Sequence, residues 1–323
     1  MIDQDSPLPV PGHHPLAEDG SALRRYERSR EDAASPSAIA AGEVVPFEAL
    51  ADRIAASGLT PGAGAILTGL LRLGRTAIFT GGGAGIEYGS LLKTAARPDH
   101  IGLHVQEAAD HLKAHRVDVL VVPGMSGYPV GSMYSVVSGI PAVLLKKQQH
   151  TPGADTARYP AGSFVIPSYT GDGDVVMSAD LPALQDIVDC VLTPQVAAQA
   201  GGDELRLTVR VAGADDIIDK ATMSQAVSES ALIVGQAAVE RFVARHRFHT
   251  GDLRPVEREV RVVAWVTPLI KGYNRPHEHL HRWFGISPFA GLNVTSVHLD
   301  PPAIGIGGIG IVGFATGGGE PIG

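Results

Sequence analysis

The chain is poor in the features that mark secreted, disulfide-bonded or membrane-spanning proteins. Its 323 residues include one cysteine, Cys190, so no intrachain disulfide can form, which suits a reducing cytoplasm. No stretch approaches the roughly 18 uninterrupted apolar residues of a membrane helix. Residues 1–14 carry acids and prolines and do not resemble a signal peptide. Basic residues are outnumbered, and the net charge of -8 argues against nucleic-acid or membrane partners. We therefore expect a cytoplasmic protein.

The composition that remains is that of an ordinary globular protein, with 44% hydrophobic and 19% charged residues. Residues 1–35 are rich in proline and mixed charges, which predicts a flexible arm. Residues 36–76 contain two runs with helical spacing and are expected to form an N-terminal helical extension. We expect a core over residues 77–270 and a C-terminal extension over residues 271–323.

A strand–loop–helix–strand unit lies in the middle of the chain. Residues 117–122 and 140–145 are largely apolar, as in buried strands, and a small-residue helix is predicted over residues 130–138. This order is typical of a parallel sheet and predicts an α/β fold. The loop and the end of the second strand carry the small, polar and basic residues Gly124, Met125, Ser126, Gly127, Tyr128, Lys146 and Lys147. Each is common in structural turns and strand ends when taken alone.

A second segment places two acids at the end of a strand. Residues 205–211 alternate apolar and polar, Asp215 and Asp216 follow, and a helix is predicted from the next turn to residue 245. Carboxylates at a strand end can accept hydrogen bonds from sugar hydroxyls. Taken alone, such a pair is a turn or a helix cap in most proteins. The turn between the acids and the helix consists of Asp219, Lys220, Ala221, Thr222, Met223 and Ser224.

Three segments in order resemble type I phosphoribosyltransferases, in particular the purine and xanthine types and the related repressors that bind phosphoribosyl pyrophosphate (PRPP). Residues 117–147 are similar to the family's pyrophosphate loop unit, residues 162–181 to its hood hairpin, and residues 209–226 to its PRPP-binding strand and loop. The resemblance implies a three-layer α/β fold with a parallel sheet and a flexible hood. It also implies a homodimer whose partners are PRPP and a small-molecule acceptor.

The resemblance also assigns roles to residues. Asp215 and Asp216 would hold the ribose hydroxyls and face the positive charge that develops on the ribose in the transition state. Residues 219–224 would wrap the 5′-phosphate at a helix N-terminus. Residues 124–128, with Lys146 and Lys147, would bind pyrophosphate. Mg²⁺ would be held mainly by the oxygens of PRPP and pyrophosphate.

The phosphate loop departs from the family pattern, which has glycines where this chain has residues 220–223. Lys220 and the hydroxyls of Thr222 and Ser224 are candidates to compensate. Two functions stay open on this basis. The first is a transferase that moves the phosphoribosyl group to a specialised nitrogen acceptor, with Glu87 or His279 as candidate bases. The second is a PRPP or nucleotide sensor without turnover.

Four further features have competing interpretations. The glycines at residues 81–85 are too closely spaced for a dinucleotide-binding motif and predict a turn or an acceptor loop. His277, His279 and His281 would share one face of a strand as zinc ligands, whereas a helix would bring only the first and last together. Acceptor contact and plain packing are the alternatives for this segment. Cys190 is expected to be a small core residue, and the glycine-rich tail after residue 303 a packed strand or an edge in a dimer.

Overall fold

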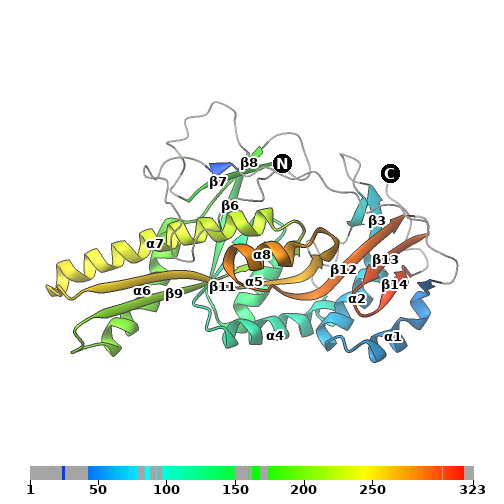
Figure 1. The fold of residues 1–323 in the computed structure, drawn as a ribbon, viewed down its shortest axis with the longest axis horizontal. Coiled ribbons are helices and arrows are strands. Elements are labelled where there is room, and N and C mark those ends of the chain that lie inside the picture. Colours follow the sequence, from blue (N-terminus) through cyan, green and yellow to red (C-terminus); the bar gives the residue numbers. More distant parts are fainter. Residues whose placement is uncertain are drawn as a thin grey trace.

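The computed structural model describes residues 24–25, 43–78, 84–87, 92, 97–149, 159, 162–167, 174–299 and 301–315. A mixed, mostly parallel sheet runs through the molecule with helices on both faces (Figure 1). This confirms the predicted α/β fold. Of the predicted N-terminal arm, Arg24 and Arg25 form a short strand, and the rest lies outside the described residues.

Over the described ranges the sheet has twelve strands, and its central strands are all parallel. In spatial order the strands of the sheet are β1 (Arg24–Arg25), β7 (Phe164–Pro167), β8 (Asp174–Ser178), β6 (Ala142–Gln149), β5 (Val119–Pro123), β9 (Leu205–Ala214), β11 (Val256–Lys271), β12 (Phe289–Leu299), β13 (Pro302–Ile306), β14 (Gly310–Gly313) and β2 (Val44–Val45). The short strand β10 (Ile217–Ile218) pairs with β11 outside this order. The parallel block is β6-β5-β9-β11-β12. On one side of it, β8 pairs antiparallel with β6 and with β7, and on the other side β13 pairs antiparallel with β12 and with β14. A separate hairpin pairs β3 (Arg75–Ile78) with β4 (Ala84–Glu87).

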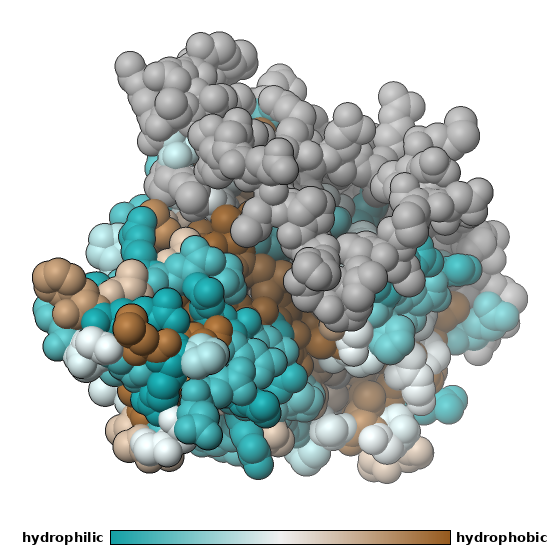
Figure 2. Space-filling model, turned by 60° about the vertical axis from the view of Figure 1, so that its left-hand side comes forward, coloured by the Kyte–Doolittle hydropathy of each residue, from teal (hydrophilic) through white to brown (hydrophobic). Residues whose placement is uncertain are grey.

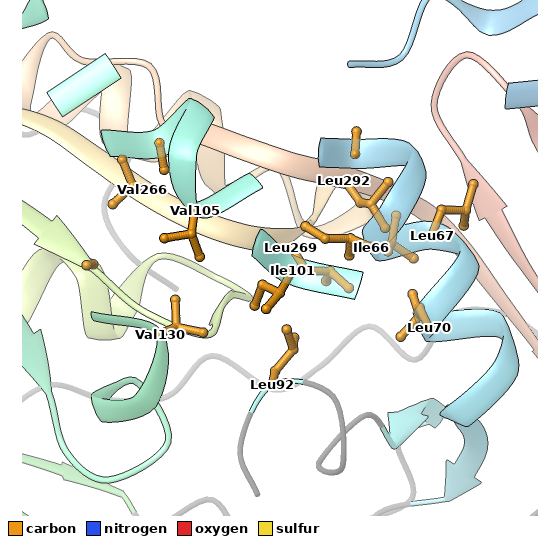
Figure 3. Close-up of a cluster of buried hydrophobic side chains, with 14 of the residues drawn as sticks. Ile66, Leu67, Leu70, Leu92, Ile101, Val105, Val130, Val266, Leu269 and Leu292 are labelled. Carbon is orange, nitrogen blue, oxygen red and sulfur yellow. The ribbon is translucent and has the colours of Figure 1, made fainter. Parts of the chain in front are cut away.

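The helices divide between the two faces of the sheet. They are α1 (Leu50–Ser57), α2 (Pro61–Leu73), α4 (Pro98–Ala114), α5 (Tyr128–Ser138), α6 (Leu181–Ala198), α7 (Thr222–Thr250) and α8 (Pro276–Phe284), with 3-10 turns η1 (Phe47–Ala49) and η3 (Gly272–Asn274). One core joins α2, α4 and α5 to the sheet, and the other joins α6, α7 and α8 to its opposite face. Figure 3 shows the first core, where Ile66, Ile101 and Val130 from three helices meet Leu269 and Leu292 from two strands.

Local sequence signals set several helix ends. The Thr60 hydroxyl caps α2 by accepting from the Ala63 N–H, and Pro61 occupies the first turn, where its missing N–H costs nothing. Gly139 and Gly251 end α5 and α7 in the left-handed conformation that glycine adopts without strain. The helix predicted over residues 130–138 is present as α5, and the helix predicted up to residue 245 is present as α7, which continues to Thr250.

The structure corrects two sequence-based expectations. Cys190 lies exposed on α6 instead of in the core, because it points away from the apolar stripe that packs on the sheet. Strand β6 continues past Lys146 and Lys147, because β8 pairs with it there. The histidine segment, for which strand and helix were both open, is helix α8, so the strand that a three-histidine zinc site requires is not formed.

The predicted hood segment contributes an antiparallel pair of strands, β7 and β8. The tail forms β13 and β14 at one side of the sheet. Residues 81–83 of the glycine run lie outside the described residues, while Ala84 and Gly85 begin β4. Among the described helices, none is long and apolar enough to cross a membrane.

Candidate functional site

The carboxyl ends of the central strands bring most of the predicted site residues to one edge of the sheet. Pro123 of β5 lies beside Leu145 of β6, and Val121 lies beside Gly213 of β9. Ala214 in turn pairs with Val266 of β11. Because parallel strands end at the same edge, the loop after β5, the basic pair and the acid pair become neighbours.

The loop after β5 packs directly against the acid pair. A Cβ atom on Gly127 would lie 2.8 Å from Oδ1 of Asp215, so a larger residue would displace the carboxylate. A Cβ atom on Gly124 would lie 2.7 Å from the carbonyl oxygen of Leu145, to which the Tyr128 hydroxyl donates a hydrogen bond. The two glycines therefore allow this loop to reach both neighbouring strands. The peptide bond between Gly124 and Met125 is cis.

The two acids are both withdrawn from solvent. Asp215 is 7% exposed and Asp216 is 2% exposed. The N–H of Asp216 donates to Oδ1 of Asp215 at 2.9 Å, and the N–H of Asp215 donates to the carbonyl of Val266 at 3.2 Å. These contacts fix the acids at the junction of β9 and β11. The carboxylates are held in place by the fold, as a preorganised polar site requires.

Asp219 is held by residues that the sequence analysis did not single out. Its Oδ2 lies 2.8 Å from Nζ of Lys271, and its Oδ1 accepts from the amide of Asn274. The Lys271 and Asp219 side chains are only 8% and 13% exposed. The one signal for Lys271 in the sequence is that it ends an apolar run, which matches its place at the end of β11. Asp219 therefore anchors the loop, and its carboxylate already has two protein donors.

Helix α7 begins directly after this loop. Ala221 adopts a left-handed conformation with φ of 61° and is buried, and no side chain that the structure describes caps the helix. Such a conformation is usual for glycine and costly for other residues, so the backbone keeps a glycine-like turn although the sequence has alanine. Thr222 and Met223 are half-buried, and Ser224 is buried. The first N–H groups and the dipole of a helix suit a bound phosphate.

The two predicted lysines differ in their surroundings. Nζ of Lys146 lies 2.9 Å from Oδ2 of Asp180, and this hydrogen bond raises the pKa of Lys146. Asp180 also caps α6 by accepting from Ala183. Lys147 follows Lys146 on the same strand and is exposed. Because successive residues of a strand face opposite sides, the two ammonium groups do not act as one pair.

A buried tyrosine and histidine lie behind the acids, and the sequence analysis missed both. The Tyr134 hydroxyl on α5 is 2.8 Å from Nε2 of His104 on α4, and both side chains are fully buried. Burial raises the pKa of Tyr134 well above its usual value, and the charges of Asp216 and Asp215 add to the shift. Burial lowers the pKa of His104 to about 4, against a smaller opposite effect of the Thr267 backbone. At neutral pH this pair is therefore uncharged.

The candidate bases and metal ligands stay unassigned. His279 stacks on Trp283 within α8, with ring centroids 5.2 Å apart, while His277 and His281 are exposed. For Glu87 the structure gives the backbone in β4. Within the described ranges, no group of three His, Cys, Asp or Glu residues is arranged to hold a metal ion. A Mg²⁺ ion bound through substrate oxygens needs few protein ligands.

No protein-family model and no curated protein sequence matches the chain. Among solved structures, it is similar to adenine phosphoribosyltransferases. The enzyme from Rhodothermus marinus is 13% identical, with 71% of this chain and 98% of that chain covered and a TM-score of 0.41. The enzyme from Thermoanaerobacter pseudethanolicus is 14% identical, with 64% and 86% covered and a TM-score of 0.35. The Trypanosoma brucei enzyme, crystallised with AMP, pyrophosphate and ribose-5-phosphate, is 12% identical, with 72% and 80% covered and a TM-score of 0.39. The TM-scores are below 0.5, so the assignment of function depends on this chain's own residues.

Proposed function

We propose that the chain is a PRPP-dependent phosphoribosyltransferase that transfers the 5-phosphoribosyl group to a nitrogen acceptor and releases pyrophosphate. The observation that carries the proposal is the contact between Gly127 and Asp215. It joins the candidate pyrophosphate loop to the candidate ribose acids. PRPP needs such an arrangement, because its sugar lies between its 5′-phosphate and its pyrophosphate.

The proposed chemistry depends on positioning and charge. The bond between C1 of the ribose and the pyrophosphate oxygen breaks, and its electron pair leaves with pyrophosphate. The acceptor nitrogen forms the new bond to C1 and then loses its proton to a base that stays unassigned. The carboxylates of Asp215 and Asp216 offset the positive charge that develops on the ribose in between. When bound, Mg²⁺ would neutralise the pyrophosphate, and residues 124–128 would orient it with backbone N–H groups.

The 5′-phosphate is proposed to lie at the start of α7. The left-handed turn at Ala221 directs the chain into the helix, whose N-terminus favours an anion. Lys220 and Thr222 on this turn offer a charge and a hydroxyl. The neutralisation of Asp219 by Lys271 removes one negative charge from beside the phosphate. Because the protein itself satisfies Asp219, we assign it to holding the loop, and the ribose contacts to the acid pair.

A sensor that binds PRPP without turnover is the second candidate. It is favoured by the loss of the family's glycines at residues 220–223, since backbone close to a phosphate usually requires them. The proposed division into a core over residues 77–270 and two extensions, a cytoplasmic location and Mg²⁺ dependence apply to both candidates.

The test is to incubate the full chain with PRPP, Mg²⁺ and a panel of purines and other amines and to measure pyrophosphate release. We expect saturable binding of PRPP and release with at least one acceptor. The double change Asp215→Asn and Asp216→Asn should abolish release while the circular dichroism spectrum is unchanged. Saturable binding without release from any acceptor would favour the sensor. If PRPP binding and release both survive the double change, the site assignment is wrong.

A further inference from the structure

Part of the molecule extends beyond the rest as an arm, which we define as residues 195–210 and 241–262. In Figure 1 the ends of α6, α7, β9 and β11 project together to one side. Within the arm, β9 and β11 pair in parallel from Leu205 and Val256 onward. Strand β5 joins β9 only from Val211. The arm therefore contains a two-stranded ribbon with two edges.

Side chains close the β9 edge of the ribbon. The Gln195 amide donates to the carbonyl of Thr208 at 2.8 Å and accepts from its N–H at 2.9 Å. The Gln199 amide makes the same two bonds with Arg206, at 2.9 and 2.8 Å. Each glutamine thus takes the place of a neighbouring strand. Sealing an edge in this way prevents it from pairing with another chain.

Among the residues that the structure describes, none covers the β11 edge in this way. The N–H of Leu205 donates to the carbonyl of Pro255, so alternate residues of β11 from Pro255 face β9. The backbone groups of Val256, Arg258 and Val260 consequently face outward. Strand β12 first pairs with β11 at Val266. No other strand among those the structure describes lies beside the outward groups.

We propose that this open edge pairs antiparallel with the same edge of a second copy of the chain, with Val260 opposite Val260. In a two-fold antiparallel pair the outward residues exchange hydrogen bonds across the axis. The register centred on Val260 places Glu259 opposite Arg261 twice. A register centred on Glu259 sets Glu259 opposite its own copy, and one centred on Arg261 does the same for Arg261. A register centred on Arg258 sets Arg258 opposite Arg258 and Glu257 opposite Glu259. Like charges in direct opposition are destabilising, so the charge pattern favours the register centred on Val260 over these three.

The side chains on the edge are available for this pairing. Glu259 and Arg261 lie on the same face, 3.8 Å apart, with 52% and 50% of their side chains exposed. Two large apolar residues stand exposed at the end of the arm, Phe248 at 86% and Leu253 at 83%. The rest of the arm surface that comes forward in Figure 2 is mostly hydrophilic. Antiparallel pairing would bring each arm's end, with these apolar groups, toward the base of the partner's arm.

The test is a charge swap on the full chain, followed by sedimentation velocity over a range of concentrations. The wild-type chain should be dimeric. Glu259→Arg and Arg261→Glu should each raise the dimer dissociation constant about tenfold or more, because each turns two attractions into repulsions. The double variant should restore dimerisation. Glu257→Arg is the matched control, since it makes the same change in charge but faces Val263 of the partner in this register.

Three outcomes would overturn the proposal. The first is a wild-type chain that is monomeric at all concentrations. The second is a dimer that withstands both single swaps, or one that the double variant does not restore. The third is slow hydrogen exchange of the outward amides of Val256, Arg258 and Val260 at concentrations where the chain is monomeric, because another segment of the same chain would then cover the edge. The experiment needs no PRPP, so its result is independent of the proposed function.

Discussion

The ammonium group of Lys271, at the end of strand β11, lies 2.8 Å from the carboxylate of Asp219 in the turn before α7. Both side chains are largely buried, and the Asn274 amide donates a second hydrogen bond to the carboxylate. Removing one member of a buried ion pair leaves the other charge without its counterpart in a poorly solvated place. The pair therefore links the stability of the fold to the shape of the proposed phosphate site.

We expect Lys271→Met to lower the free energy of unfolding by about 3 kcal/mol, because it leaves the Asp219 carboxylate buried without its cation. The same change in an Asp219→Asn background should cost clearly less. Urea unfolding of the wild type, both single variants and the double variant measures this coupling. Strictly additive effects would contradict the role of the ion pair.

Lys220→Ala should weaken the binding of PRPP in the presence of Mg²⁺ roughly tenfold, because a charge-assisted contact to the 5′-phosphate is lost. Isothermal titration calorimetry gives the dissociation constant directly. Lys113→Ala on α4 is the control, since that lysine is exposed on a helix that follows neither loop of the site. An unchanged dissociation constant for Lys220→Ala would count against its assignment.

His104 should make the protein less stable in mild acid. Burial lowers its pKa from 6.5 to about 4 in the folded state, so the unfolded chain binds the proton more readily. Protonation of His104 therefore leaves the free energy of unfolding unaffected above pH 6.5 and lowers it progressively as the pH falls from 6.5 toward 4. Between pH 7 and pH 5 the loss should be about 2 kcal/mol.

His104→Gln should reduce this pH dependence, although it also removes the contact to Tyr134 and lowers stability at every pH. Urea unfolding at pH 7 and pH 5 separates the two effects, and His277→Gln at an exposed site is the control. If His104→Gln and the wild type lose the same free energy of unfolding between the two pH values, the buried histidine is not responsible.

Ala221 offers a test of the turn before α7. Ala221→Gly should change the free energy of unfolding by no more than about 1 kcal/mol, since relief of the left-handed conformation offsets the lost methyl group. Ala221→Val should destabilise by roughly 2 kcal/mol, because a branched side chain is poorly tolerated at positive φ. Thermal unfolding and PRPP titration of both variants check this. Equal behaviour of the two variants would show that the turn can rearrange.

Much of the fold could be predicted from local sequence patterns. The strand–loop–helix–strand unit at residues 117–147 and the helix after the acid pair are both present. These signals depend on hydrophobic spacing and on turn residues close together in the chain. The histidine segment shows the limit of such patterns. The alternating histidines at residues 277–281 were compatible with a strand and with a helix. In the structure the segment is helix α8, which packs against β11 and α7.

The sequence by itself determined which groups the site contains: two adjacent acids, a glycine-bearing loop and a turn that enters a long helix. Only the tertiary structure decided their neighbours. It placed Gly127 against Asp215, Lys271 on Asp219 and the Tyr134–His104 pair behind the acids. It also sealed one edge of the arm with glutamines and left the other open. Contacts between residues far apart in the chain depend on strand order and register, which the packing of the whole core selects and no local pattern encodes.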